Sequence, residues 1–270
     1  MILSMAMIVL GTGASVLAVI LVRRQAPPGG HLGAIPAASG IFGVVGTGFA
    51  VLLAFVIFSA FDSYHAARQY VGTESVALRQ LSSTAAFFPP TDRATLQAQL
   101  ICYGRAVVQD EWPKMQRGQE SALAGEWLVR MDQTVQAMPL QNDKEIAALS
   151  NWFSQNQQRQ EGRRGRLAES TAFVPGFVWF LLLVLIVVTI GYACLFADPE
   201  VELLGQVAGT VALAATLVAG LALVWVLDRP FNDRGAGIGP ARMQAVVQTM
   251  EAGYVSSTPL PCGASGQPTS

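Results

Sequence analysis

The chain has 270 residues, of which 52% are hydrophobic and only 13% are charged, and its formal net charge is −1. Soluble globular domains usually carry about twice this share of charged residues, so the composition indicates a membrane protein. The near-neutral balance excludes a strongly basic nucleic-acid binder, and we expect no nucleic-acid partner. The three cysteines lie at unrelated spacings, which argues against a disulfide framework.

Four segments without a charged residue are each long enough to cross a membrane as a helix. They cover residues 2–22, 41–61, 173–197 and 203–227. A helix rises about 1.5 Å per residue, so about 20 residues span a hydrocarbon core of roughly 30 Å. No basic residue precedes the first segment, and Arg23 and Arg24 follow it, so we interpret it as a retained helix and not as a cleaved signal peptide.

The four spans predict an all-α polytopic membrane protein with a helical bundle inserted between spans two and three. The expected organisation is two transmembrane helices in 1–61, a cytosolic helical region in 62–172, two transmembrane helices in 173–227 and a tail in 228–270.

Arginine positions predict how the chain is oriented. Most arginines near the span ends lie on the side that holds 62–172 and the tail, whereas the loop at 198–202 on the other side is acidic. Positive loops stay in the cytoplasm, so we expect a multi-pass protein of the cell inner membrane with both termini in the cytoplasm. Arg23 and Arg24, taken alone, favour the opposite orientation.

Apolar residues in 62–172 recur at helical spacing and do not alternate as in strands. Tyr64, Val71, Leu78 and Leu81 continue the second span without a breaker as far as Pro89, which predicts one long helix that leaves the membrane. Further helices are expected over 91–113 with Thr91 as N-cap, over 118–137, and from about 142 into the third span.

The tail begins with a short amphipathic pattern and then changes composition. Pro240 precedes apolar residues at helical spacing, from Met243 to Met250, which predicts a short helix. Beyond about Tyr254, Ser, Thr, Pro and Gly dominate, and we expect disorder.

The chain offers little material for catalysis or metal binding. Its two histidines, His31 and His65, are far apart, and no cysteine has a histidine nearby in the sequence. We therefore expect no enzyme activity, no metal and no cofactor. A membrane enzyme that depends on His65 or Cys102 is the weakest of the alternatives.

The four spans carry hydroxyls and small residues but no charge. Coupled transporters usually place ionisable groups inside the membrane, so this absence disfavours a coupled carrier. We interpret Thr189, Thr210 and Thr216 as bonding back to their own helices. Glycine pairs such as Gly205 and Gly209 predict close packing between helices.

One face of span two suggests a pore lining. Val51, Phe55, Phe58 and Asp62 recur at spacings of four, three and four, and therefore share a helix face. A ring of such faces would form an apolar constriction with carboxylates at its inner mouth, and such constrictions can gate ions. Alternatively, the phenylalanines face lipid or a neighbouring helix, and spacing alone favours this second interpretation.

The element order and several motifs resemble those of the bestrophins and, more specifically, of bacterial bestrophin-like membrane proteins. The motifs are Tyr64-x-x-Ala67-x-x-x-Val71-x-x-Glu74, Phe88-Pro89, Glu111-Trp112-Pro113-x-Met115-x-x-Gly118 and Leu227-Asp228-Arg229-Pro230-Phe231. The resemblance covers residues 1–250. It implies a pentameric, anion-conducting channel in which span two lines a hydrophobic neck.

The chain departs from the bestrophin pattern near its tail. The Asn-Pro-Phe-Gly of true bestrophins stands here as Arg229-Pro230-Phe231-Asn232, and only Asp233 and Glu251 remain of the acidic calcium clasp. Calcium gating is therefore not expected. An ionised Asp62 facing the pore would also repel anions.

Two further patterns keep more than one interpretation. We interpret Glu111-Trp112-Pro113 as a helix stop and packing corner in preference to a ligand site. Arg163, Arg164 and Arg166 could meet anionic lipid headgroups, at about 1 kcal/mol each, or line a cytosolic vestibule.

The leading hypothesis is a homo-oligomeric channel in the lipid bilayer that conducts small inorganic ions, in particular anions. The alternative hypothesis is a non-conducting membrane scaffold whose cytosolic bundle binds a protein partner.

Overall fold

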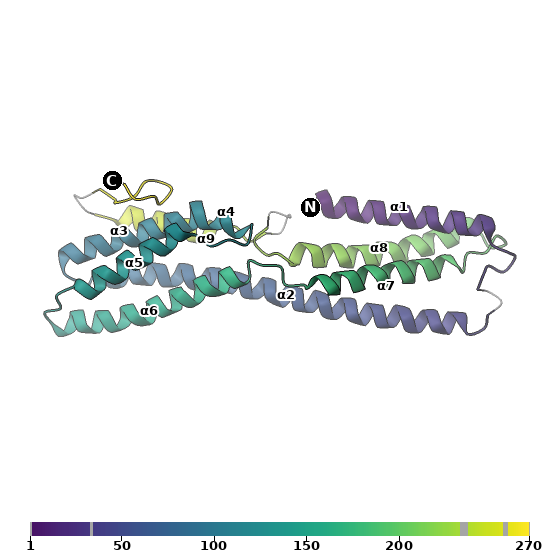
Figure 1. The fold of residues 1–270 in the computed structure, drawn as a ribbon, viewed down its shortest axis with the longest axis horizontal. Helices are drawn as coiled ribbons and strands as arrows, with labels where there is room; N and C mark the ends of the chain where they lie inside the picture. Colours follow the sequence, from purple (N-terminus) through teal and green to yellow (C-terminus); the bar gives the residue numbers. More distant parts are fainter. Residues whose placement is uncertain (1, 33–34, 233–236, 256–258, 270) are drawn as a thin grey trace. The chain divides into compact units, whose positions relative to one another are not determined.

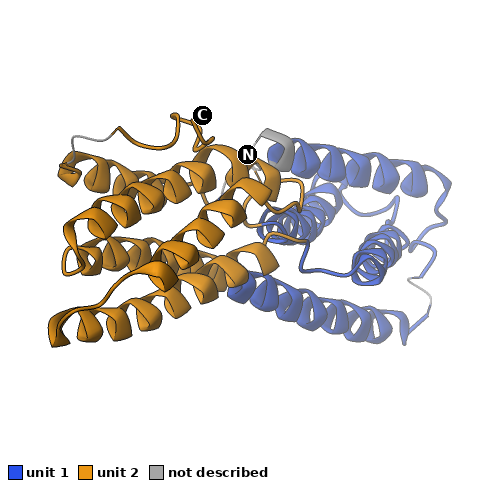
Figure 2. Cartoon of the chain, turned by 60° about the vertical axis from the view of Figure 1, so that its left-hand side comes forward, with its two compact units in different colours: residues 1–64, 172–229, 234–237 blue, residues 65–171, 230–233, 238–270 orange. Residues whose placement is uncertain are grey.

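The computed structural model describes residues 2–32, 35–232, 237–255 and 259–269 (Figure 1). Within these ranges the chain forms helices and loops without a named strand, so the all-α prediction is confirmed. The chain divides into two compact units, which Figure 2 colours separately. Unit 1 is built mainly from residues within 1–64 and 172–229, and unit 2 mainly from residues within 65–171 and 230–269.

Unit 1 holds the four candidate membrane helices. They are α1 (Ile2–Gln25), the first part of α2 (Ala38–Ala85), α7 (Gly176–Cys194) and α8 (Leu203–Leu227). Each contains a stretch that is long and apolar enough to cross a membrane, which confirms the expected number of spans.

Small residues bring the helices of unit 1 together. A Cβ atom on Gly11 of α1 would lie 2.8 Å from the Cγ2 atom of Val218 on α8, and one on Gly220 would lie 2.7 Å from the Cδ2 atom of Leu53 on α2. A side chain at either glycine would therefore require the Val218 or Leu53 side chain to shift. Gly205 and Gly209 differ from the expected close packing: they line a cavity of about 500 Å³, and a Cβ there would meet nothing within 4 Å.

Hydroxyl groups in these helices bond to their own backbone, as expected. The hydroxyls of Thr189, Thr210 and Thr216 donate to the carbonyl oxygens four residues earlier, at 2.7, 3.0 and 2.9 Å. Each polar group is thereby satisfied within its own helix, as an apolar surrounding requires.

Unit 2 is a helical bundle that the second half of α2 begins. It also contains α3 (Pro90–Ala106), the π-helix η1 (Val107–Glu111), α4 (Trp112–Met115), α5 (Ala122–Ala137), α6 (Asp143–Ala168) and α9 (Ala241–Gly253). The 48-residue length of α2 confirms the prediction that the second span continues as one helix.

Local sequence explains where several helices of unit 2 begin. The Ser121 hydroxyl accepts a hydrogen bond from the backbone N–H of Ala124, and the Asn142 side chain accepts one from that of Glu145. These are N-caps, which satisfy donors that a helix leaves free at its start. Thr91 is not the N-cap that we expected, because Pro90 already occupies the first turn, where a proline is tolerated.

The predicted helix over 91–113 is interrupted. After Ala106 the backbone forms the five-residue π-helix η1 before the α-helical pattern resumes at Trp112. A π-turn carries i→i+5 hydrogen bonds and is frequent at functional sites. Hydrophobic periodicity did not predict this interruption, and it also missed the break between α6, which ends at Ala168, and α7, which begins at Gly176.

The helices of unit 2 pack around one hydrophobic core. Its largest buried side chains include Trp127, Trp152, Tyr103 and Phe88. Close approach between α6 and α2 depends on Gly162, where a Cβ would lie 2.6 Å from the backbone nitrogen of Glu74. Backbone atoms cannot move aside as a flexible side chain can.

We expect Gly162→Ala to destabilise the protein by about 1–3 kcal/mol, since an added methyl group overpacks this contact. Gly125→Ala in α5 is the matched control, because a Cβ there meets nothing within 4 Å. The control should gain up to about 1 kcal/mol from helix propensity. Thermal unfolding of the detergent-solubilised protein, followed by circular dichroism, measures both. Equal midpoints for the two variants would contradict the packing argument.

Candidate functional site

A cluster of four charged side chains lies inside unit 2, and we call it the charge cluster: Glu74, Glu111, Arg163 and Arg166. Arg166 lies between the two carboxylates, with its Nε 2.6 Å from Glu74 Oε2 and its Nη2 2.5 Å from Glu111 Oε1. Arg163 donates from Nη2 to Glu111 Oε2 at 2.6 Å. Glu74, Glu111 and Arg166 are fully buried.

Tyr103 and Arg159 extend the charge cluster. The Tyr103 hydroxyl donates to Glu74 Oε1 at 2.5 Å, and the guanidinium of Arg159 stacks over the tyrosine ring at 5.3 Å. Burial, together with the nearby Glu74 carboxylate, raises the pKa of Tyr103 far above its ordinary value. The hydroxyl therefore stays protonated and acts as a donor.

The residues of the charge cluster come from three helices, α2, η1 and α6. Arg159, Arg163 and Arg166 follow one another at spacings of four and three, so they share one face of α6. Glu111 is the last residue of η1, and Glu74 lies on α2. The cluster therefore joins α2, η1 and α6 through buried ion pairs.

The charge cluster corrects the predicted role of the arginines. Arg166 is fully buried, so its side chain neither reaches lipid headgroups nor lines a vestibule, whereas Arg163 is 9% exposed and lines a surface cavity of about 450 Å³. Only Arg164 is exposed. The signal that could have found the pairing is the helical spacing of the arginines, read together with the two glutamates of the motifs.

The arginines control the ionisation of Glu111. Burial opposes the charged carboxylate, but Arg166 and Arg163 outweigh that effect and lower the pKa of Glu111 below its usual range. The carboxylate is therefore held ionised at neutral pH. Arg166 is kept charged in turn, because Glu74 and Glu111 raise its pKa against the effect of burial.

Other motif residues form a packing corner in unit 2. The ring of Trp112 meets that of Phe231 edge to face, with centroids 5.7 Å apart, and its Nε1 donates to the carbonyl oxygen of Ile238 at 3.2 Å. The carbonyl oxygen of Pro230 accepts from the backbone N–H of Ile238 at 2.7 Å. Residues far apart in sequence thus meet here, as the interpretation of a packing corner expects.

The remaining motif residues lie at helix ends and turns or are partly buried. Asp228 joins the end of α8 to the segment before α7, since its Oδ1 accepts from the backbone N–H of Val174 at 2.7 Å. Gly118 has a φ of +70°, a left-handed conformation that favours glycine, at the turn after α4. Pro113 lies in the first turn of α4, which follows η1 directly, so the predicted helix stop at Glu111-Trp112-Pro113 is wrong. Tyr64 is partly buried.

The four residues predicted to line a pore lie on α2 and are exposed in the single chain. Val51, Phe55 and Phe58 are about two-thirds exposed at 66%, 68% and 70%, and Asp62 is also exposed. No residue that the structure describes covers this face. The pore role of this face stays a prediction.

A disulfide bond between Cys102 of α3 and Cys262 corrects two expectations about the tail. It crosslinks the chain where spacing argued against a disulfide framework. It also orders residues 259–269, which we call the strap, where composition predicted disorder. Of the two acidic residues left from the calcium clasp, Asp233 lies outside the described residues, and Glu251 forms an ion pair with Arg105 at 2.7 Å.

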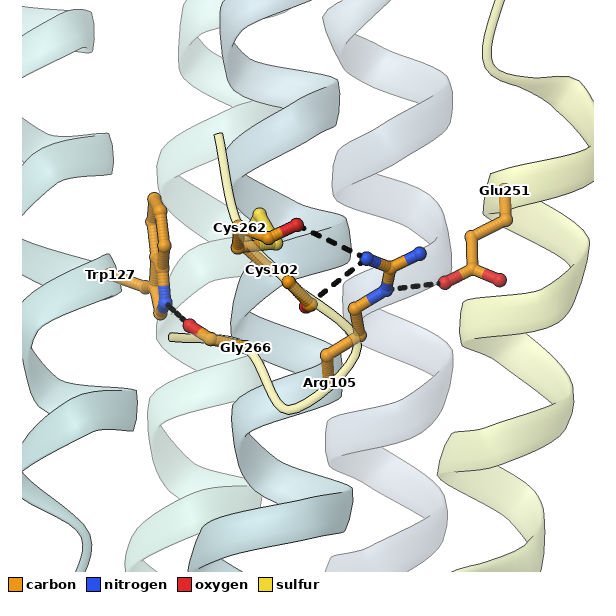
Figure 3. The surroundings of a disulfide bond; sticks show 7 residues. Cys102, Arg105, Trp127, Glu251, Cys262 and Gly266 are labelled. Carbon is orange, nitrogen blue, oxygen red and sulfur yellow. Dashed lines mark hydrogen bonds and ion pairs between the residues drawn. A yellow bond between two sulfur atoms is a disulfide. The ribbon is translucent and has the colours of Figure 1, made fainter. Parts of the chain in front are cut away.

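The strap is also held by side chains of α3 and α5 (Figure 3). Arg105 Nη1 donates to the carbonyl oxygens of Cys262 and Gly263, at 3.3 and 3.2 Å, and Trp127 Nε1 donates to that of Gly266 at 2.7 Å. These partners lie well over a hundred residues away in sequence, so local composition could not indicate them.

We expect Arg166→Leu to destabilise the protein by about 3–5 kcal/mol, because it leaves two buried carboxylates without their shared cation. Arg164→Leu on the same helix is the control, and the exposure of Arg164 should limit its effect to about 0.5 kcal/mol. Thermal unfolding in detergent measures the difference. A similar small loss for both variants would show that the ion pairs do not hold the bundle.

Acid should weaken the protein through Glu111. A lowered pKa in the folded state means that the stabilisation is present above the unfolded value, about 4.3, and is lost as pH falls through the folded value. We therefore expect the unfolding midpoint to fall as the pH drops below about 4. Glu111→Gln should lower the midpoint at pH 7 and flatten its acid dependence. An unchanged acid dependence in Glu111→Gln would assign the effect to other carboxyl groups.

Comparisons with known proteins agree with this architecture. Two crystal structures of single-substitution variants of a bacterial bestrophin homologue from Klebsiella pneumoniae align with TM-scores of 0.68 and 0.69, at 14% and 12% identity. Both alignments cover 92% of this chain, and they cover 99% and 98% of those chains. A crystal structure described only as that of a membrane protein aligns with a TM-score of 0.65 at 14% identity, over 98% of this chain and 99% of that one. At these identities the likeness concerns the fold.

No curated protein sequence matches the chain. The model of the Bestrophin-like domain matches residues 11–238. This match includes α1 from residue 11, the other three candidate membrane helices, the charge cluster and the packing corner around Trp112. The chain therefore belongs to the Bestrophin-like family.

Proposed function

We propose that the protein is a homo-oligomeric ion channel of the inner membrane, in which the first part of α2 surrounds the pore. The observation that carries this proposal is the apolar face of Val51, Phe55 and Phe58, which the rest of the single chain leaves exposed. Membership of the Bestrophin-like family and the absence of charged residues in the four spans support it.

The physical basis of the proposed gate is dewetting. A narrow ring of phenylalanine side chains offers no hydrogen bonds to water or ions, so a small change of its width switches the pore between wet and dry. We propose five copies around the axis, as the family resemblance implies. Each copy contributes Phe55 and Phe58 to the constriction.

Ion preference is proposed to follow from the charge at the pore mouth. Small inorganic anions are the ions that the resemblance implies, and Asp62 opposes them, because a ring of carboxylates attracts cations. Replacing Asp62 by Asn removes the negative charge of that ring while keeping the size and shape of the side chains.

We also propose that unit 2 and both termini lie in the cytoplasm. Arg68 and Arg79 after the second span, and Arg229 after the fourth, support this orientation.

The channel hypothesis predicts unitary currents from the purified protein in planar bilayers. Phe55→Ala and Phe58→Ala should each change the conductance or the open fraction, because each widens the proposed constriction. Phe177→Ala is the control: Phe177 is also an exposed phenylalanine, but it lies on α7. In the same recordings, Asp62→Asn should shift the reversal potential in a salt gradient toward the anion value.

Two outcomes would contradict the proposal. Silent bilayers from a folded oligomer would favour the non-conducting scaffold, and equal effects of the α2 and α7 variants would place the pore elsewhere.

A further inference from the structure

The strap joins the rest of unit 2 through one covalent bond, a small number of hydrogen bonds, and the packing of Leu260 and Gly266. Cys262 supplies the bond, Arg105 and Trp127 supply the hydrogen bonds, and the strap folds on itself through a bridge between Cys262 and Pro268. The family match ends at residue 238, so the strap lies outside the part shared with the family model.

The strap lies against α3 next to the π-helix. Gly266 has a φ of +79°, and a Cβ there would lie 2.5 Å from the backbone nitrogen of Ala106, the last residue of α3. The next residue begins η1, which ends with Glu111 of the charge cluster. The strap therefore covers the start of the one π-turn among the described helices, and that turn positions a buried carboxylate.

We propose that Cys102 and Cys262 form a reversible redox modification site that fastens the strap when oxidised and releases it when reduced. The proposal rests on the cytoplasmic placement of unit 2 given above. Disulfides in that compartment are usually transient, catalytic or redox-sensing, because cellular thiols keep cysteines reduced.

The co-substrate is a dithiol, such as a thioredoxin-type protein. Its first thiolate attacks Cys262 Sγ, the sulfur–sulfur bond breaks, and Cys102 leaves as a thiolate that takes up a proton. The second thiol of the dithiol, as its thiolate, attacks the mixed disulfide and releases Cys262, which is protonated in turn. Two electrons and two protons have then passed from the dithiol to the protein, and the dithiol has become a disulfide. The reverse exchange, with that disulfide as the oxidant, forms the Cys102–Cys262 bond again.

Exchange requires that the strap first open locally. Cys102 is fully buried and Cys262 is 4% exposed, so a protein thiol cannot reach either sulfur in the closed form. Once the bond is reduced, the strap is held by hydrogen bonds, each of which contributes little net free energy because water can replace it, and by the packing of Leu260 and Gly266 against unit 2. Its release exposes Trp127 and Ala106, beside the start of η1.

Thiol trapping in cells tests the site directly. The experiment uses the full chain with Cys194→Ala, which removes the one free cysteine. Cells are quenched with acid, the protein is denatured, and a polyethylene-glycol maleimide then adds one label to each free thiol. Growing cells should yield protein with two labels, and cells treated with diamide should yield unlabelled protein. Cys262→Ser should carry one label under both conditions.

Two trapping results would overturn the proposal. Unlabelled protein in growing cells would identify a permanent crosslink, and two labels after diamide would show that the bond does not form. An added Gln141→Cys in the exposed loop before α6 reports the side of the membrane to an impermeant maleimide. If the maleimide labels the cysteine at position 141 from outside the cell, the proposed orientation is wrong. If this position is protected, the orientation holds and the failure belongs to the proposed redox site. Neither readout depends on conduction.

Limited proteolysis of the purified full chain tests the release of the strap. Dithiothreitol should raise the rate of cleavage near residues 259–269 by about tenfold or more, because cleavage follows the population of the open form. Cys262→Ser should be cleaved at the fast rate with or without the reductant. Equal rates for oxidised and reduced protein would show that the disulfide does not hold the strap, which would contradict its role as a fastener.

Discussion

The pairing of Arg166 with two buried carboxylates fixes the architecture of unit 2. A buried charge without its partner costs several kcal/mol, so α2, η1 and α6 must meet in the one register that joins Glu74 and Glu111 to the same guanidinium. Gly162 permits that meeting because a larger residue would strike the backbone of α2. Charge and close packing therefore specify the same contact.

Unit 1 is organised by the opposite constraint. Its helices carry no charged residue in the spans, hydroxyls such as Thr189 bond to their own helix, and contacts depend on small residues such as Gly11 and Gly220. Packing in lipid is driven by fit between surfaces rather than by removal from water. The large apolar side chains left outside, Phe55 and Phe58 among them, are exposed on the single chain.

Sequence patterns predicted the features that depend on neighbouring residues. Charge-free stretches predicted four spans, an uninterrupted apolar stripe predicted the length of α2, and Asn142 predicted the start of α6. The missed features depend on residues distant in sequence or on a backbone choice without a side-chain signature. The disulfide joins residues 160 apart, Arg166 pairs with partners 92 and 55 residues away, and hydrophobic periodicity did not predict η1.

The π-helix makes the spacing between α3 and Trp112 intolerant of insertions and deletions. Each residue of a helix turns the chain by about 100°. Removing one residue within 107–110 would let the backbone relax to a regular α-helix, but it would alter the direction in which Glu111 and Trp112 point. The carboxylate would leave Arg166 and Arg163, and the indole would leave Phe231. The five-residue π-helix thus sets the directions of both side chains, so that the ion pairs of Glu111 and the ring contact of Trp112 form together.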